Sequence, residues 1–560
     1  MKQNAMKGSS GFVAAALVGT LVSMLNTGDV PGAWNHLFQL PLLAGLPDLP
    51  QFAQDAFVQS LRFYSSGLWQ GLYGLAPGEG AFTLLFVLAV LSRLCAFVGF
   101  LACAALIGVQ SLGQRLVFVT LVAFSSLLVG GSYAGAGGLF TANFTHSEAA
   151  NASMLLCVWA AAQSRFTLAL SFAGVTFFLN AFMGVWCAVP VAALALVQLM
   201  RKEIAFRSLV LQAIPGLLIF GALASVVVKS VLANPEFGAP VDFDYPTYLT
   251  HYYAGHFLVA SHPWSELAKF GLVSAVSLLA AWRLKQRDPR ALFILVAICA
   301  FLLLWLAGAL LPLVTRSPVF LNLHLLRAGV GVHLFGGLAL AVLTTVWLSS
   351  ASVSERLFGA PLLVLGGTSL RPLLALAGLA LLLEPRLQAK DRLMSVLAKY
   401  RFRTLVLAVT VGLVWPAVVL RHVLVNRDLE RQIAVWREIG LWARAVTPAE
   451  ALFMIPVFNF VDPPPADFPL TALARGHEVF RFTAQRRVFV DFAAGAAVMW
   501  QPSYYRLWRE RIGEVMALPD FESRIAYARA HAIDYLVDRC AGAQREVVKV
   551  EDRCVYKIAP

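Results

Sequence analysis

Long apolar runs separated by short polar gaps make up most of the chain. A run of about 20 apolar residues is long enough to cross the hydrocarbon core of a membrane as a helix. The pattern predicts eleven membrane-spanning helices, at residues 10–26, 81–108, 114–131, 147–163, 165–182, 184–200, 208–231, 267–284, 290–314, 326–349 and 404–421.

One further apolar stretch contains breaks. From Leu357 to Glu384 it is interrupted by Gly366, Gly367 and Arg371. A single helix here would place the basic segment 386–403 on the opposite side of the membrane from the other basic gaps. We therefore expect two short helices or a re-entrant hairpin, which gives about 11–13 spans in all.

The pattern changes after residue 421. Residues 425–446 have apolar positions at helical spacing, residues 502–531 form a second amphipathic segment, and the runs RVFVDF, IDYLVD and VYKI are rich in strand-forming residues. Short β-rich runs that alternate with helices predict a small α/β domain. We expect a transmembrane domain over residues 1–421, with long loops at 27–80 and 232–266, and an α/β domain over 422–560.

The charged residues indicate which gaps share a side of the membrane. Residues 27–80 hold four acids and one base, and residues 234–266 hold four acids and no base. The gaps at 201–207, 283–290 and 386–403 are basic. Because basic loops stay in the cytoplasm, we expect the acidic loops and the C-terminal domain to be extracytoplasmic.

Composition supports a membrane protein and excludes other classes. Of the 560 residues 59% are hydrophobic and 13% charged, with a formal net charge of +13. Much of the positive excess lies beside apolar runs, where it orients helices and meets anionic headgroups rather than nucleic acid. We expect a multi-pass protein of the inner (cytoplasmic) membrane with membrane lipids as partners. Lys2 and Lys7 precede the first run like a signal peptide, but no small-x-small cleavage site follows, so the first helix should be retained.

The cysteines fall into two groups. Cys540 and Cys554 lie in the C-terminal domain, where they form a disulfide if the domain is extracytoplasmic and otherwise remain two reduced thiols at strand ends. The others lie in apolar runs and are expected to be inert: Cys95, Cys103, Cys157, Cys187 and Cys299.

The first loop carries the leading candidate for catalysis. Asp29 follows the first helix closely, and a carboxylate at the membrane–water interface can act as a general base toward a hydroxyl. The alternative is that Asp29 caps a short helix. The polar side chains that follow suit a sugar ligand, and we take them as substrate-binding candidates: Asn35, His36, Gln39 and Asp55.

The second acidic loop offers a weaker metal site. Asp242, Asp244 and His256 could hold a divalent cation, although their spacing matches no zinc motif. The alternative is a loop that contacts substrate, with His251 as the contact. A divalent cation is the one cofactor that these residues suggest.

Basic residues also occur at the outer end of a predicted span. The segment RSPVFLNLHLLR brings Arg316, His324 and Arg327 to this end, against the usual orientation of bases. Arginines here either bind a phosphate or extend to lipid headgroups. Asn180, near the outer end of another span, either forms a hydrogen bond between helices or belongs to the site.

The layout resembles the GT-C superfamily of polyprenyl-linked glycosyltransferases. NHLFQLP followed by FAQDAFV resembles the first loop of bacterial members of this type, THYYAGHF resembles a His-containing loop, and RRVFVDF, YLVD and VYKI are similar to their terminal domain. The chain lacks the paired Asp-Glu after the first helix and the WWD-type motif of the oligosaccharyltransferases, so the resemblance names no acceptor.

The resemblance implies that a sugar moves from a lipid-phosphate donor to an extracytoplasmic acceptor. Asp29 would be the base, and Arg316 or Arg327 would hold the donor phosphate. Two other functions stay open: a transporter or flippase of a lipid-linked or polar solute, and a non-catalytic polysaccharide assembly factor. A transporter needs polar groups deep in the membrane. The sequence offers few, with His333 and Arg371 as candidates, which favours the enzyme.

Overall fold

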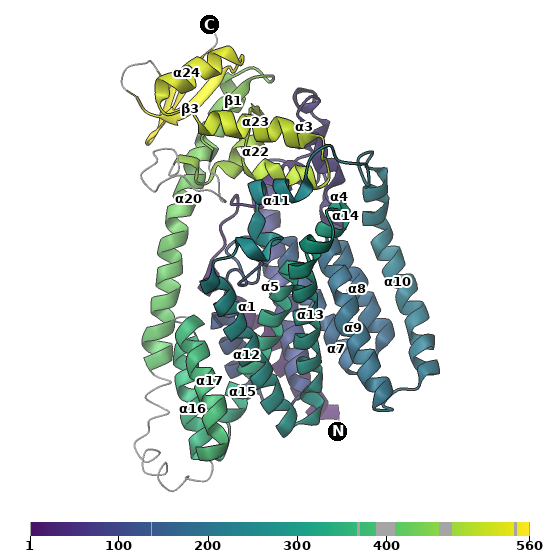
Figure 1. Ribbon diagram of the computed structural model, residues 1–560. Coiled ribbons are helices and arrows are strands. Elements are labelled where there is room, and N and C mark those ends of the chain that lie inside the picture. The colour runs from purple at the N-terminus through teal and green to yellow at the C-terminus, as the bar shows by residue number, and fades with distance from the viewer. Residues whose placement is uncertain are drawn as a thin grey trace.

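The computed structural model describes residues 2–135, 137–366, 370–387, 409–457, 473–541 and 546–558. It is a bundle of helices with a small mixed domain at one end, and the N-terminus lies at the other end (Figure 1). Within these residues, seven helices are long and apolar enough to cross a membrane. The predicted class, a polytopic helical membrane protein with a small C-terminal α/β domain, is confirmed.

Ten of the eleven predicted spans coincide with helices, and the eleventh, 404–421, is described only from residue 409. The corresponding helices are α1 (Lys2–Thr27), α5 (Gly80–Leu106), α6 (Leu112–Phe124), α7 (His146–Ala162), α8 (Phe166–Leu179), α9 (Ala181–Met200), α10 (Phe206–Ala233), α12 (Trp264–Arg287), α13 (Leu292–Val314) and α15 (Gly329–Leu348). Helix α15 is buried along nearly its whole length and forms the centre of the bundle.

One predicted span is too long. The apolar run 114–131 was expected to be helical throughout, but α6 ends at Phe124. The chain then folds back on itself, with isolated bridges from Val129 to Phe140 and from Gly131 to Gly138. A Gly130–Gly131 pair favours a turn over a helix. The described residues of the segment 125–145 therefore form a loop at the end of the bundle.

The interrupted stretch forms two helices, α16 (Val353–Gly366) and α17 (Leu370–Leu387), which lie side by side (Figure 1). Arg287 of α12 binds both Glu355 of α16 and Glu384 of α17. These charged contacts join the pair of helices to the bundle. Most of the basic segment 386–403 and Gly367 lie outside the described residues.

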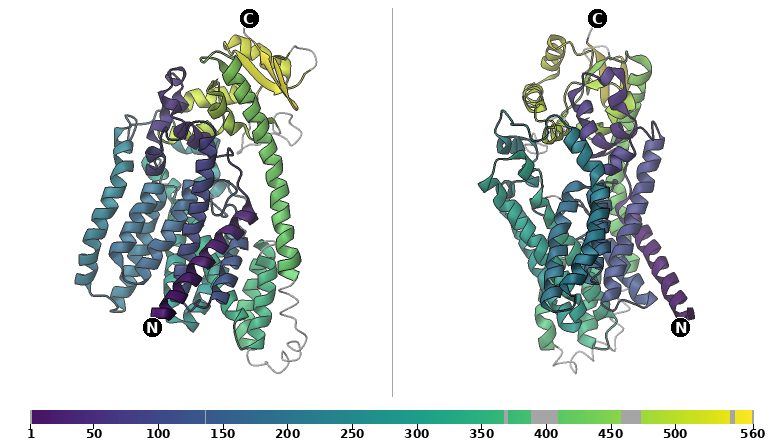
Figure 2. Two further views of the ribbon diagram at one scale, coloured as in Figure 1. Left: turned by 180° about the vertical axis from the view of Figure 1, so that it is seen from behind. Right: turned by 90° about the vertical axis from the view of Figure 1, so that its right-hand side faces the viewer.

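The polar loops gather at the end of the bundle that carries the C-terminal domain, as seen from two further directions in Figure 2. The first loop is folded rather than extended: it contains α2 (His36–Leu43), α3 (Ala56–Ser60) and α4 (Gly67–Gly71). Every residue of α2 is buried, so this loop has a core of its own that it shares with the C-terminal domain.

A single helix links the membrane part to this domain. Helix α20 (Trp415–Val446) follows a π-helical segment, Thr410–Val414, and runs from beside the bundle into the domain (Figure 1). At its start Trp415 stacks on Phe124 with ring centroids 4.6 Å apart. The boundary expected at residues 421–422 therefore falls inside a continuous helix.

In its described residues the domain is built on a five-stranded sheet of order β2-β1-β3-β5-β4. The inner strand β1 pairs in parallel with β2 and β3, and β5 runs antiparallel to β3 and β4. The strands are β1 (Leu452–Met454), β2 (Arg487–Val488), β3 (Tyr535–Arg539), β4 (Val548–Val550) and β5 (Arg553–Lys557), and α23 (Tyr504–Met516) and α24 (Phe521–Ala530) lie between β2 and β3 in the chain. Cys540, directly after β3, forms a disulfide with Cys554 of β5.

Candidate functional site

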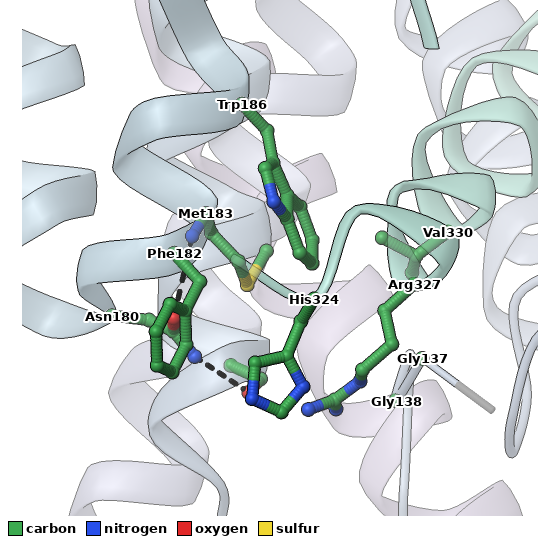
Figure 3. Close-up of a pocket in the computed structure, with 10 residues that line it drawn as sticks. Gly137, Gly138, Asn180, Phe182, Met183, Trp186, His324, Arg327 and Val330 are labelled. Carbon is green, nitrogen blue, oxygen red and sulfur yellow. Dashed lines mark hydrogen bonds between the residues drawn. The ribbon is translucent and has the colours of Figure 1, made fainter. Parts of the chain in front are cut away.

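A cleft at the loop end of the bundle holds Arg327 (Figure 3). The space in it is about 270 Å³, open solvent included. Arg327 belongs to a short 3₁₀ turn, η7 (Leu325–Ala328), directly before α15. The cleft is lined by Gly137, Gly138, Ser147, Asn180, Phe182, Met183, Trp186, His324, Arg327 and Val330.

Glycine lets the 125–145 loop approach this turn closely. A Cβ atom at Gly135, whose φ is +139°, would lie 2.6 Å from the carbonyl oxygen of Leu326. A Cβ at Gly137 would lie 2.8 Å from the Cβ of Val330. A larger side chain at either position would force a neighbour to shift, and Gly137 itself lines the cleft.

His324 lies beside Arg327 in this cleft (Figure 3). Its side chain is buried between Phe182 and Phe257, with ring centroids 4.5 Å from each. Its backbone has φ of 52°, an uncommon conformation for a residue with a side chain. Neither ring nitrogen has a hydrogen-bond partner in the described part of the chain. A buried polar group without a partner is costly, so the ring is available to a ligand.

The side chain of Arg327 also lacks partners for its polar groups. Among the described residues it forms no ion pair, and its Nε–H has no acceptor. The aromatic side chains of Phe182 and Trp186 line the cleft with it. Arg316, the other arginine of the predicted pair, is 80% exposed and binds Asp244 at 3.1 Å. The structure thus separates two arginines that the sequence left equivalent.

Asp29 lies in the turn between α1 and α2 and is partly buried. No hydrogen bond or ion pair of its carboxylate is found among the described residues, and it does not cap a helix. The pKa of Asp29 is raised to about 6. Burial is the main cause; Arg93 lowers the pKa, and the charges of Glu148 and Glu430 raise it. An unpaired carboxylate with a pKa near neutrality can accept a proton.

Arg93, whose charge acts on Asp29, was not anticipated from the sequence. Arg93 of α5 and Glu148 of α7 form an ion pair in which both side chains are 2% exposed. A lone arginine inside an otherwise apolar helix of 27 residues was the available signal, because charges within spans mark functional positions.

Helix α7 joins the surroundings of Asp29 to the cleft. Ser147 in its first turn lines the cleft of Arg327, and the next residue, Glu148, binds Arg93 beside Asp29. Asn180, at the start of α9, donates to Ser147 Oγ at 3.1 Å and accepts from the Met183 N–H at 3.3 Å. Asn180 therefore lines the cleft and also ties two helices together.

The remaining first-loop candidates lie in the core of the loop or at its surface. His36 is fully buried: its Nδ1 accepts from Gly32 N–H at 2.7 Å and its Nε2 donates to the Phe144 carbonyl at 3.1 Å. Burial lowers the pKa of His36 to about 4, so the ring is neutral. Both nitrogens are thus engaged with the backbone. Asn35 is exposed at the start of α2.

Asp55 and Gln39, the other two polar candidates of this loop, differ in whether their side chains have hydrogen-bond partners. Asp55 caps α3 by accepting from Val58 N–H at 3.0 Å, which gives it a structural role. Gln39 is completely buried, and neither atom of its amide finds a partner among the described residues. Gln39 is therefore the one first-loop candidate with a buried amide still to be satisfied.

The weak metal candidates do not converge. Asp242 binds Arg506 at 2.7 Å, Asp244 binds Arg316, and His256 packs on Tyr253 with ring centroids 4.0 Å apart. In the described residues, no group of three or more His, Cys, Asp or Glu side chains is placed to hold a metal ion.

His251 contacts the C-terminal domain. Its Nδ1 lies 3.0 Å from the hydroxyl of Tyr505 in α23. Burial, followed by the charge of Arg509, lowers the pKa of His251, so the ring is neutral at pH 7. His251 therefore joins the second acidic loop to the C-terminal domain.

Comparison with known proteins gives matches among solved structures only. No family model and no curated protein matches the chain. ArnT from Cupriavidus metallidurans in the apo state is 13% identical with a TM-score of 0.42, over 99% of this chain and 98% of ArnT. The same protein bound to undecaprenyl phosphate is 14% identical with a TM-score of 0.37, over 97% of this chain and 96% of that one.

Arabinofuranosyltransferase AftD from Mycobacteria is 14% identical with a TM-score of 0.41, over 94% of this chain and 35% of AftD. Because every one of these TM-scores is below 0.5, we take the function from the residues of this chain rather than from these likenesses.

Proposed function

We propose that this chain is a membrane glycosyltransferase that moves a sugar from a lipid-phosphate-linked donor to an acceptor hydroxyl. The reaction would take place at the end of the bundle that carries the loops and the C-terminal domain, on the extracytoplasmic face of the inner membrane. The observation that carries the proposal is the guanidinium of Arg327, which lies in a cleft without an anionic partner among the described residues.

Arg327 is partly buried, and an unpaired charge that is partly removed from water is costly unless a ligand compensates it. Arginine suits phosphate because its planar fork donates two parallel hydrogen bonds. His324 beside it has two unsatisfied ring nitrogens, and Phe182 and Trp186 in the cleft wall offer flat surfaces for a sugar ring. The donor phosphate would therefore lie against Arg327 and His324, with its sugar toward the aromatic side chains.

The proposed step needs one base and one positive group. Asp29 removes the proton from the acceptor hydroxyl, and the resulting oxygen attacks the anomeric carbon of the sugar. The bond from that carbon to the phosphate oxygen breaks, and its electron pair stays on the lipid phosphate. Arg327 stabilises the charge that develops on this leaving group, which in such reactions is often the largest contribution.

The transporter alternative draws less support. His333, one of its two polar candidates, is buried, and both ring nitrogens are used: Nε2 by the Tyr133 N–H at 3.3 Å and Nδ1 by the Leu127 carbonyl at 3.2 Å. Arg371, the other candidate, is exposed. Neither contributes an unsatisfied polar group to a path across the bundle.

A binding experiment tests the assignment of the phosphate site. Undecaprenyl phosphate is titrated into the full chain in detergent, and binding is followed by native mass spectrometry. We expect Arg327→Ala to weaken binding at least about tenfold, which corresponds to the loss of one charge-assisted contact. Arg316→Ala is the matched control and should bind like the wild type. Equal binding by the wild type and Arg327→Ala would contradict the assignment.

A further inference from the structure

Arg93 holds both ends of the turn that carries Asp29. On the side before Asp29, its Nη1 donates to Ser23 Oγ at 2.7 Å and to Thr27 Oγ1 at 3.1 Å. Both acceptors lie in the last turns of α1, and Thr27 is two residues before Asp29.

On the other side, Nη2 of Arg93 donates to the Thr141 carbonyl at 2.6 Å. The next residue along, Ala142, accepts a hydrogen bond from the Val30 N–H, directly after Asp29. The guanidinium is therefore linked to the chain on both sides of Asp29 although it comes from a different helix.

Glu148 completes this network. It binds Arg93 through Nε and, at 3.4 Å, through Nη2, and its Oε2 lies 3.5 Å from the Thr141 N–H. Thr145 fixes the start of α7 by accepting from the Glu148 N–H at 3.2 Å. Glu148 thus contacts both Arg93 and Thr141 of the 125–145 loop.

The charges that face Asp29 come from three helices. They are Arg93 of α5, Glu148 of α7 and Glu430 of α20. With Glu148 bound to it, Arg93 is already neutralised. Without Glu148, the charge of the guanidinium would act on the Asp29 carboxylate without an opposing charge beside it.

We propose that Arg93 and Glu148 are positioning residues of the reaction: Arg93 fixes the Asp29 turn, and Glu148 occupies Arg93 so that the Asp29 carboxylate stays free. This inference rests on the proposed role of Asp29 as the base. Arg93 and Glu148 touch no substrate in this proposal and act only through Asp29.

The test measures the protonation of Asp29 without any substrate. Dicyclohexylcarbodiimide reacts with protonated carboxyl groups, so the labelling of Asp29, read by mass spectrometry of the full chain across a pH series, gives the midpoint of its titration. In the wild type the midpoint should lie near the pKa of about 6. Asp29→Asn identifies the labelled site.

Two variants should move this midpoint in opposite directions. Glu148→Gln leaves Arg93 unopposed, which favours the charged form of Asp29 and lowers the midpoint by about one pH unit. Arg93→Gln removes the positive charge and raises the midpoint by about the same amount. Glu384→Gln is the matched control, since it neutralises a buried carboxylate of the Arg287 network on α17; its midpoint should equal that of the wild type.

Coincident midpoints in the wild type, Glu148→Gln and Arg93→Gln would overturn the proposal. Should Arg93→Gln fail to fold, the midpoint of Glu148→Gln tests the proposal by itself. This variant is expected to fold, because the glutamine amide oxygen can still accept a hydrogen bond from Arg93. Arg93→Lys keeps the charge but not the paired contacts, so we expect an unchanged midpoint together with a lower transfer rate. If instead Asp29→Asn transfers sugar normally, the proposed function fails while the labelling result stands.

Discussion

His477 donates a hydrogen bond from Nε2 to Asp491 at 3.0 Å inside the C-terminal domain, and its Nδ1 donates to the Ala474 carbonyl. A histidine that donates from both nitrogens is protonated. Burial lowers the pKa of His477, but the charge of Asp491 and its hydrogen bond outweigh this and raise it to about 9. The pair links the turn before α22 (Phe480–Ala484) to the segment after β2.

The pair makes stability depend on pH. Because the folded pKa of His477 exceeds its ordinary value of 6.5, the stabilisation is complete below pH 6.5 and is lost as the pH rises through about 9. We expect the stability difference between the wild type and His477→Gln to shrink by about 3 kcal/mol between pH 6.5 and pH 9.5. Thermal unfolding of the full chain at both pH values measures it. A difference independent of pH would show that His477 is neutral.

Asp29→Asn should remove most of the transfer activity. Loss of a general base costs about 10²–10⁴-fold in rate. In the wild type the rate should fall as the pH drops through about 6, since the base must be deprotonated. The measurement is the composition of extracellular glycan in the native host, with the expression level checked. An unchanged glycan in Asp29→Asn would count against the base and favour a transporter or a scaffold.

Asp55→Ala should affect folding rather than catalysis. The carboxylate caps α3, and loss of such a cap costs about 1 kcal/mol. Unfolding of the full chain in mixed micelles measures the effect, with Asp48→Ala, whose partner Arg62 is exposed, as the control with a smaller loss. A large loss of undecaprenyl phosphate binding without a change in stability would instead make Asp55 a ligand contact.

The disulfide should contribute to the stability of the C-terminal domain. Cys540 and Cys554 close a loop with a sequence separation of 14, and cross-linking a loop of this size stabilises a fold by about 3 kcal/mol. Replacing both cysteines by serine should lower the free energy of unfolding by about this amount. Non-reducing peptide mapping should recover the linked pair. Free thiols at both positions in protein prepared without reductant would contradict it.

The orientation in the membrane can be tested by labelling cysteines from outside. Pro77 lies before α5 and Gln286 near the end of α12, at opposite ends of the bundle, and both are exposed. In a background without Cys95 and Cys299, we expect Pro77→Cys to react with an impermeant maleimide in intact cells. Gln286→Cys should react only after lysis. The reverse pattern would invert the predicted orientation.

The alternation of apolar runs and charged gaps was enough to predict most of the long helices, the break of the stretch 357–384 into two short helices or a re-entrant hairpin, and the mixed terminal domain. These features depend on local hydrophobicity and on side-chain charge, which can be read along the chain. The first loop was correctly identified as long, and Arg327 and Asp29 were named. What each side chain does there could not be read from spacing.

Only the tertiary structure distinguishes equivalent residues. It places Arg327 in a cleft and Arg316 at the surface with Asp244, and it makes Asp55 a helix cap while Asp29 stays unpaired. It also brings Arg93 to Glu148, 55 residues away in the chain. Burial, desolvation and pairing depend on contacts between distant segments, and these decide which charge is free to act.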